Sequence, residues 1–159
     1  KYKDNLIHYN WHWHWHWGTG EALNNGTHMI DLLRWGMQVD YPVKVSSNGG
    51  PYHYQDDWET PDTQVINLDF AEDMTMTWEG RSCNGKDIEG SAVGALFYGE
   101  EGSLLIPGGD SYTHFDLEGK VVEKAEAKIK DARQLFEIDG KYAAARLAAA
   151  KARALLVAP

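Results

Sequence analysis

The chain has 159 residues, of which 43% are hydrophobic and 25% charged, and this length is enough for one domain with its own core. Its net charge of −9 argues against nucleic acid as a partner, and no run of about 20 apolar residues is present that would cross a membrane. The single cysteine, Cys83, excludes an internal disulfide, so we expect a cytoplasmic protein.

Tryptophan and histidine alternate without interruption from Trp11 to Trp17. Because successive side chains of a strand point to opposite faces, this alternation predicts a strand over residues 6–17. Its four tryptophans would share one face, and we expect them to pack in the core because each such ring buries ~150–250 Å². A sugar- or aromatic-binding platform is the alternative interpretation.

The other face of this predicted strand carries a row of histidines. They are His12, His14 and His16. Same-face neighbours lie about 6.8 Å apart, so two adjacent histidines can share one zinc-like ion but all three cannot. A mixed site would need His53, a carboxylate such as Asp56 or Asp57, or the histidines of a symmetric partner. An exposed or interface row that binds no metal is the simpler alternative.

A helix is predicted over residues 21–37, where apolar residues recur at helical spacing, and Pro42 follows its end. Short alternating segments bounded by glycine, proline and acidic residues then predict strands. These strands are residues 43–47, 64–70, 74–78, 92–98, 103–106 and 112–116. We expect residues 64–70 and 74–78 to form a hairpin.

The last part of the chain has a different composition. Residues 124–138 and 141–157 lack glycine, proline and tryptophan and are rich in alanine, lysine and glutamate, which predicts two helices separated by Asp139 and Gly140. Such propensity-driven composition favours a designed or grafted helical hairpin, and a natural alanine-rich terminus is the alternative. We therefore predict a single α+β domain, with an open, mostly antiparallel sheet of about six strands in residues 6–122 and a helical hairpin in residues 123–159.

Residues 18–35, GTGEALNNGTHMIDLLRW, resemble the G-G-G-x-x-x-D-x-G-x-H-x-I-D-x-x-R-W stretch of the Gfo/Idh/MocA oxidoreductases. The neighbouring segments VDYP, SSNGG, DTQ and YGEEG are similar to the second domain of that family. The resemblance covers residues 6–122. It implies an open-faced sheet domain for substrate and subunit contacts, joined in the family to an amino-terminal Rossmann domain that binds NAD(P).

The resemblance places His28 at the family's histidine position and Asn24 at the position of its catalytic aspartate. An amide cannot act as a general base, so we expect His28 and Asn24 to form an inactive half-site. The sequence contains neither a G-x-G-x-x-G fingerprint after a strand nor the family's E-K-P motif with its catalytic lysine. We therefore expect no cofactor binding and no dehydrogenase activity from this polypeptide alone.

Three functional hypotheses follow. The leading one is a non-enzymatic, excised and engineered scaffold that self-associates through the open sheet face, which residues such as Phe70 and Trp78 would line unless the terminal helices cap it. The second is a zinc-like metal protein that uses His12, His14, His16 and His53. The third is a fragment of a sugar or polyol oxidoreductase that is active only with its cofactor domain.

Overall fold

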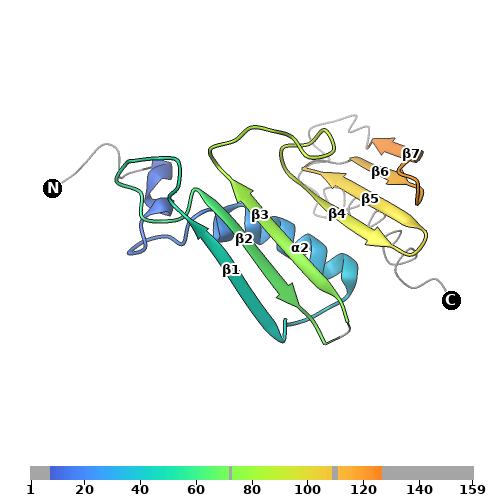
Figure 1. Ribbon diagram of the computed structural model, residues 1–159, viewed down its shortest axis with the longest axis horizontal. Helices are drawn as coiled ribbons and strands as arrows, with labels where there is room; N and C mark the ends of the chain where they lie inside the picture. Colours follow the sequence, from blue (N-terminus) through green and yellow to red (C-terminus); the bar gives the residue numbers. More distant parts are fainter. Residues whose placement is uncertain (1–7, 72, 109–110, 127–159) are drawn as a thin grey trace, which may run out of the picture. The chain divides into compact units, whose positions relative to one another are not determined.

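A computed structural model describes residues 8–71, 73–108 and 111–126 (Figure 1). This part of the chain is mostly antiparallel sheet, with seven strands in two sheets and a few short helices, which agrees with the α+β class. The chain divides into two compact units. The first comprises the described parts of Lys1–Asp31 and Val39–Gly85, and the second those of Leu32–Gln38 and Lys86–Pro159.

The first unit contains a three-stranded antiparallel sheet in the order β1 (Lys44–Gly50), β2 (Thr63–Asp69), β3 (Thr75–Arg81). The predicted hairpin is confirmed: Asp69 pairs with Thr75, and the N–H of Phe70 donates to the carbonyl of Met74 at 2.9 Å. The strand predicted at residues 43–47 is also confirmed. It extends to Gly50 because the last two glycines of β1 continue the ladder with β2.

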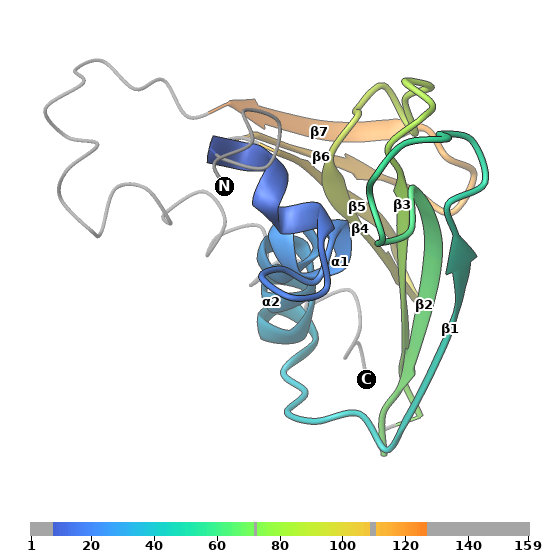
Figure 2. The ribbon, with the colours of Figure 1, turned by 90° about the vertical axis from the view of Figure 1, so that its left-hand side faces the viewer.

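Alternation along β2 and β3 places Leu68, Met76 and Trp78 on one buried face of this sheet. The helix α1 (Glu21–Asn24) and the start of α2 (Gly26–Met37) lie on this side (Figure 2). Phe70 and Trp78 are only 5% and 8% exposed, so they do not line an open face. The other expectation, that the terminal helices cap this face, lies outside the described residues. The same alternation that buries Trp78 turns Thr77 and its neighbours to the other face.

The predicted helix over residues 21–37 is present as two helices separated at Asn25. Asparagine and glycine are weak helix formers, and Asn25–Gly26 is the point of interruption. A Cβ atom on Gly26 would lie 3.1 Å from the indole nitrogen of Trp78, so the glycine allows α2 to begin directly against that ring. In the described residues, no helix has the length and apolar character to span a bilayer.

Residues 8–17, the described part of the strand predicted at residues 6–17, do not form a strand. The described part of this segment is a 3-10 helix, η2 (His8–Trp13), followed by a turn through Trp17. The N–H groups of Trp17 and Gly18 donate to the carbonyl of His14 at 3.0 and 2.7 Å, so the backbone bonds are closed locally. A Cβ atom at Gly18 would collide with the backbone of His12. The chain therefore folds back on itself at a glycine, which the alternation of side chains does not reveal.

This change of backbone also redistributes the tryptophans. Trp13 is 7% exposed, whereas Trp11, Trp15 and Trp17 are between 42% and 57% exposed. The expectation that all four pack in the core is wrong. A 3-10 helix and turn give these rings no common face, so a single core surface cannot take all of them.

The second unit contains a four-stranded antiparallel sheet in the order β4 (Gly94–Gly99), β5 (Gly102–Pro107), β6 (Ser111–Phe115), β7 (Val121–Glu126). These strands confirm the three predicted at residues 92–98, 103–106 and 112–116. Buried residues of this unit include Phe97, Leu104, Ile106 and Tyr112. Gly102, with φ of +148°, lies against the carbonyl of Phe115, where a side chain has no room.

Two further predictions need correction. The expected single sheet of about six strands is two sheets, because the ladder of the first ends at β3 and that of the second begins at β4. Residues 124–126, expected in a helix, pair with β6 as part of β7. Val121 and Val122, at the start of β7, favour a strand. The prediction of a helix followed the alanine-rich composition and did not use this local signal. The remainder of the predicted helical hairpin lies outside the described residues.

Candidate functional site

In the first unit, η2 is held against the loop that joins β1 to β2 (Figure 1). The N–H groups of Glu59 and Thr60 donate to the carbonyl of Trp13 at 2.9 and 3.3 Å. In return, the N–H of Trp15 donates to Oε2 of Glu59 at 2.8 Å. These bonds bring together two segments that are far apart in the sequence.

Six rings from these two segments form a continuous line, which we call the aromatic row. Its members, in spatial order, are Trp11, His12, Tyr9, Trp13, Trp58 and Tyr54. Successive ring centroids lie 3.7, 4.6, 6.0, 4.9 and 6.4 Å apart. One of these contacts, between Trp13 and Trp58, joins η2 to the loop, and an aromatic pair at this distance contributes about 0.5–1.5 kcal/mol beyond its burial.

Asp62 fixes the other end of this loop. Its Oδ2 accepts hydrogen bonds from the N–H groups of His53 and Tyr54 at 2.8 and 3.1 Å, and its Oδ1 accepts one from the hydroxyl of Thr63 at 2.7 Å. Burial of the carboxylate by itself raises the pKa of Asp62, but these hydrogen bonds to the charged form outweigh it and lower the pKa to about 2. Asp62 is therefore a structural anion that orients the loop.

Asn24, one of the two residues suggested by the family resemblance, lies at the end of α1 next to the aromatic row. Its Nδ2 donates to the hydroxyl of Tyr9 at 2.5 Å and to Oε2 of Glu21 at 3.4 Å, while the amide of Asn25 donates to the same carboxylate. This network orients the amide of Asn24. It does not give the amide the proton affinity of a general base.

His28, the second of these residues, lies in the first turn of α2 and is exposed. Its backbone N–H donates to the carbonyl of Asn25 at 3.2 Å. The two positions thus fall on either side of the interruption between the helices, and the amide of Asn24 is held in the network while the ring of His28 is open to solvent.

The histidines of the predicted metal site are distributed over different environments. Nδ1 of His12 donates to the carbonyl of Tyr9 at 2.6 Å, and its ring stacks on Trp11. His14 is buried, with its ring edge-on to that of Trp17 at 5.9 Å.

His16 and His53 are both exposed, and each packs edge-on against the aromatic residue that follows it. Since residues 8–17 do not form a strand, His12, His14 and His16 do not form the one-sided row that the metal interpretation required. Within residues 8–71, 73–108 and 111–126, no group of three or more histidine, cysteine, aspartate or glutamate side chains is arranged to hold a metal ion.

Sequence reasoning does not identify Tyr9, Trp58 or Asp62 as members of this region. The contact of Trp13 with Trp58, at 4.9 Å, has no counterpart in local spacing. One local signal does exist: Asp56 precedes Trp58 by two residues, and its Oδ1 accepts the N–H of Trp58 at 2.9 Å, a turn that aspartate favours.

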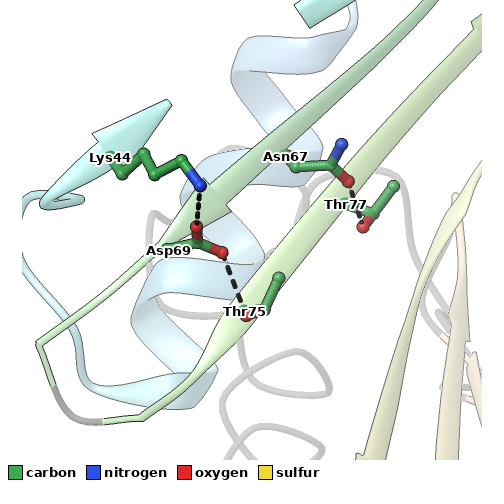
Figure 3. A network of polar contacts seen from close by, with 5 residues as sticks. All are labelled: Lys44, Asn67, Asp69, Thr75 and Thr77. Carbon is green, nitrogen blue, oxygen red and sulfur yellow. Dashed lines mark hydrogen bonds and ion pairs between the residues drawn. The ribbon is translucent and has the colours of Figure 1, made fainter. Parts of the chain in front are cut away.

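The face of the first sheet opposite Trp78 is mostly polar, although Val65 also lies on it. This surface, which we call the polar face, comprises Lys44, Ser46, Asn67, Asp69, Thr75 and Thr77. Asp69 lies 3.7 Å from Nζ of Lys44 and accepts the hydroxyl of Thr75 at 3.1 Å (Figure 3). At the next cross-strand pair on this face, the hydroxyl of Thr77 donates to Oδ1 of Asn67 at 2.9 Å. Several side chains of the polar face are thus ordered by hydrogen bonds across the strands.

Comparison with known proteins adds one positive result. The model of a protein family described as the GFO/IDH/MocA C-terminal domain matches residues 2–105. No curated protein and no solved structure matches the chain. The matched residues include the aromatic row, both helices, the whole first sheet and β4, and they make up about two thirds of the sequence. The chain therefore belongs to the GFO/IDH/MocA C-terminal domain family.

Proposed function

We propose that this domain is the association module of an NAD(P)-dependent oxidoreductase, non-catalytic by itself, and that it self-associates through the polar face. Family membership supports the connection to oxidoreductases. Asn24 supports the non-catalytic part, because its amide stands where a general base would be needed and is held by Tyr9 and Glu21.

The observation that carries the proposal is the order of the polar face. A side chain that is already held in one conformation loses less conformational entropy on association than a free one. The salt bridge of Lys44 with Asp69 and that of Glu79 with Arg81 place both signs of charge on this side of the sheet. A surface with paired charges can meet a copy of itself across a two-fold axis without net repulsion at the contact.

The matched pair Ser46→Lys and Ser47→Lys tests this proposal. Both serines are exposed on the edge strand β1, but Ser46 faces Asn67 in the polar face, whereas Ser47 belongs to the opposite face. We expect wild-type protein and Ser47→Lys to associate, and Ser46→Lys to shift to monomer because a long charged side chain cannot be accommodated. Size-exclusion chromatography with light scattering measures the mass.

Two results would contradict the proposal. One is a wild-type chain that stays monomeric at the highest attainable concentration. The other is equal association of both lysine variants, which would place the interface elsewhere.

A further inference from the structure

The aromatic row lies in a part of the sequence without any basic side chain. Residues 8–33 and 45–80, which contain the whole row, include no lysine or arginine. The loop that carries Trp58 contains three carboxylates: Asp56, Asp57 and Glu59. This segment of the sequence therefore combines exposed aromatic rings with several carboxylates.

Hydrogen bonds tie two of these carboxylates to the backbone of the two segments that carry the rings. Oδ1 of Asp56 accepts the N–H of Trp58 at 2.9 Å, and Oε2 of Glu59 accepts the N–H of Trp15 at 2.8 Å. Both acidic residues are exposed, so their charge is available to a ligand at the surface.

Several rings are open to solvent although they belong to a packed group. Tyr9 is 55% exposed, Trp11 42% and Tyr54 40%, whereas Trp13 is buried and stacks on Trp58. The face of an aromatic ring carries negative electrostatic potential and attracts an organic cation, and nearby carboxylates add to this attraction. Because η2 and the loop are joined by backbone hydrogen bonds, little ordering is required when a ligand binds.

We propose that the exposed rings of the aromatic row, together with Asp56 and Glu59, bind a small organic cation of the alkylammonium or quaternary ammonium class. The site lies within the first unit and is independent of the polar face. Charge complementarity favours this occupant: the carboxylates repel an anion and attract a cation, and a neutral molecule lacks that attraction between charges.

Choline is the probe, and its control is the uncharged alcohol in which a carbon atom replaces the ammonium nitrogen. The indole N–H signals of the seven tryptophans are followed by NMR in the full chain, with Trp11 assigned from its variant. We expect choline to shift the Trp11 signal with a dissociation constant in the millimolar range and the uncharged alcohol to leave it unchanged. Added salt should weaken the binding of choline.

Two variants and one control locate the site. Trp11→Ala should weaken the binding of choline about fivefold, as expected for the loss of one exposed cation–π contact. Trp35→Ala, at a tryptophan with the same 42% exposure on α2, should leave it unchanged. Glu59→Gln keeps an acceptor for the N–H of Trp15 but removes the charge, and it should also weaken binding.

The proposal is overturned if choline produces no saturable shift, or if the uncharged alcohol or a neutral disaccharide binds as well as choline does. Equal affinity of wild type, Trp11→Ala and Glu59→Gln would overturn it as well. Near-UV circular dichroism checks that each variant is folded. If Trp11→Ala is not, the comparison of Glu59→Gln with wild type decides.

Discussion

At the scale of single residues, Asp62 shows how one charge organises a loop. Its carboxylate is buried, yet it stays ionised because two backbone N–H groups and the hydroxyl of Thr63 donate to it. Without it, the partly buried N–H groups of His53 and Tyr54 would lose their acceptor, which costs stability. A zinc site at the four histidines, by contrast, stays a prediction.

We expect Asp62→Ala to lower the free energy of unfolding by about 2–3 kcal/mol, the usual contribution of hydrogen bonds to a charged group. The carboxylate has an ordinary pKa of 3.8, which folding lowers to about 2. Its contribution is therefore complete above pH 3.8 and is lost as the pH falls towards about 2.

Urea unfolding at several pH values measures this effect. The difference between wild type and Asp62→Ala should shrink between these two pH values. Asp57→Asn, at an exposed carboxylate of the same loop, is the control and should change little. A difference that is independent of pH down to about 2 would show that Asp62 does not act through its ionised form.

At the scale of elements, the contact between α2 and β3 depends on a glycine. Gly26 begins α2 directly against the indole of Trp78, and Gly80 lies close to the same ring on the strand. The ring is therefore confined between two backbone positions, and it has little freedom to move away from a new side chain.

Gly26→Ala should destabilise the protein by about 1 kcal/mol. An alanine in a helix gains up to about 1 kcal/mol over glycine, but overpacking of a confined ring costs about 1–3 kcal/mol. Thermal unfolding measures the net change. Gly85→Ala, at an exposed position with open space around it, is the control and should be neutral or slightly stabilising. A Gly26→Ala variant more stable than wild type would show that the ring of Trp78 can move away from the new methyl group.

At the scale of the whole molecule, the net charge of −9 opposes association of two copies. Salt screens this long-range repulsion, whereas the hydrogen-bonded contacts of a polar interface are less sensitive to it. The same negative charge favours the binding of a cation at the aromatic row, because the acidic side chains there attract it.

Salt should therefore have opposite effects on the two proposed activities. We expect the associated fraction in light scattering to rise with ionic strength and the affinity for choline to fall. If association weakened steeply with salt, attraction between unlike charges would dominate the interface, and the role assigned to the ordered hydrogen bonds of the polar face would be wrong.

Local patterns predicted a large part of the fold. The hairpin of β2 and β3 follows from alternation on both sides of a short turn, and the strands β1, β4, β5 and β6 follow from alternation and glycine punctuation. The family was also within reach of the sequence, because residues 18–35 carry its motif in one continuous stretch.

Contacts between distant segments were not predictable in this way. The alternation of Trp11 to Trp17 satisfies the rule for a strand, but the fold-back at Gly18 and the bonds from Glu59 and Thr60 to Trp13 produce a 3-10 helix and turn. Strand pairing likewise decided that the ladders form two sheets. An engineered origin of residues 123–159 stays a prediction.

The sequence by itself determined the family, the acidic charge and most of the strands, because these depend on composition and on neighbours a few residues apart. Only the tertiary structure decided that Trp11 is exposed, that the ring of Trp13 stacks on that of Trp58, and that the side chains of the polar face are ordered. The reason is physical: burial and ring contacts depend on which distant segment packs against a residue, and local periodicity carries no information about that partner.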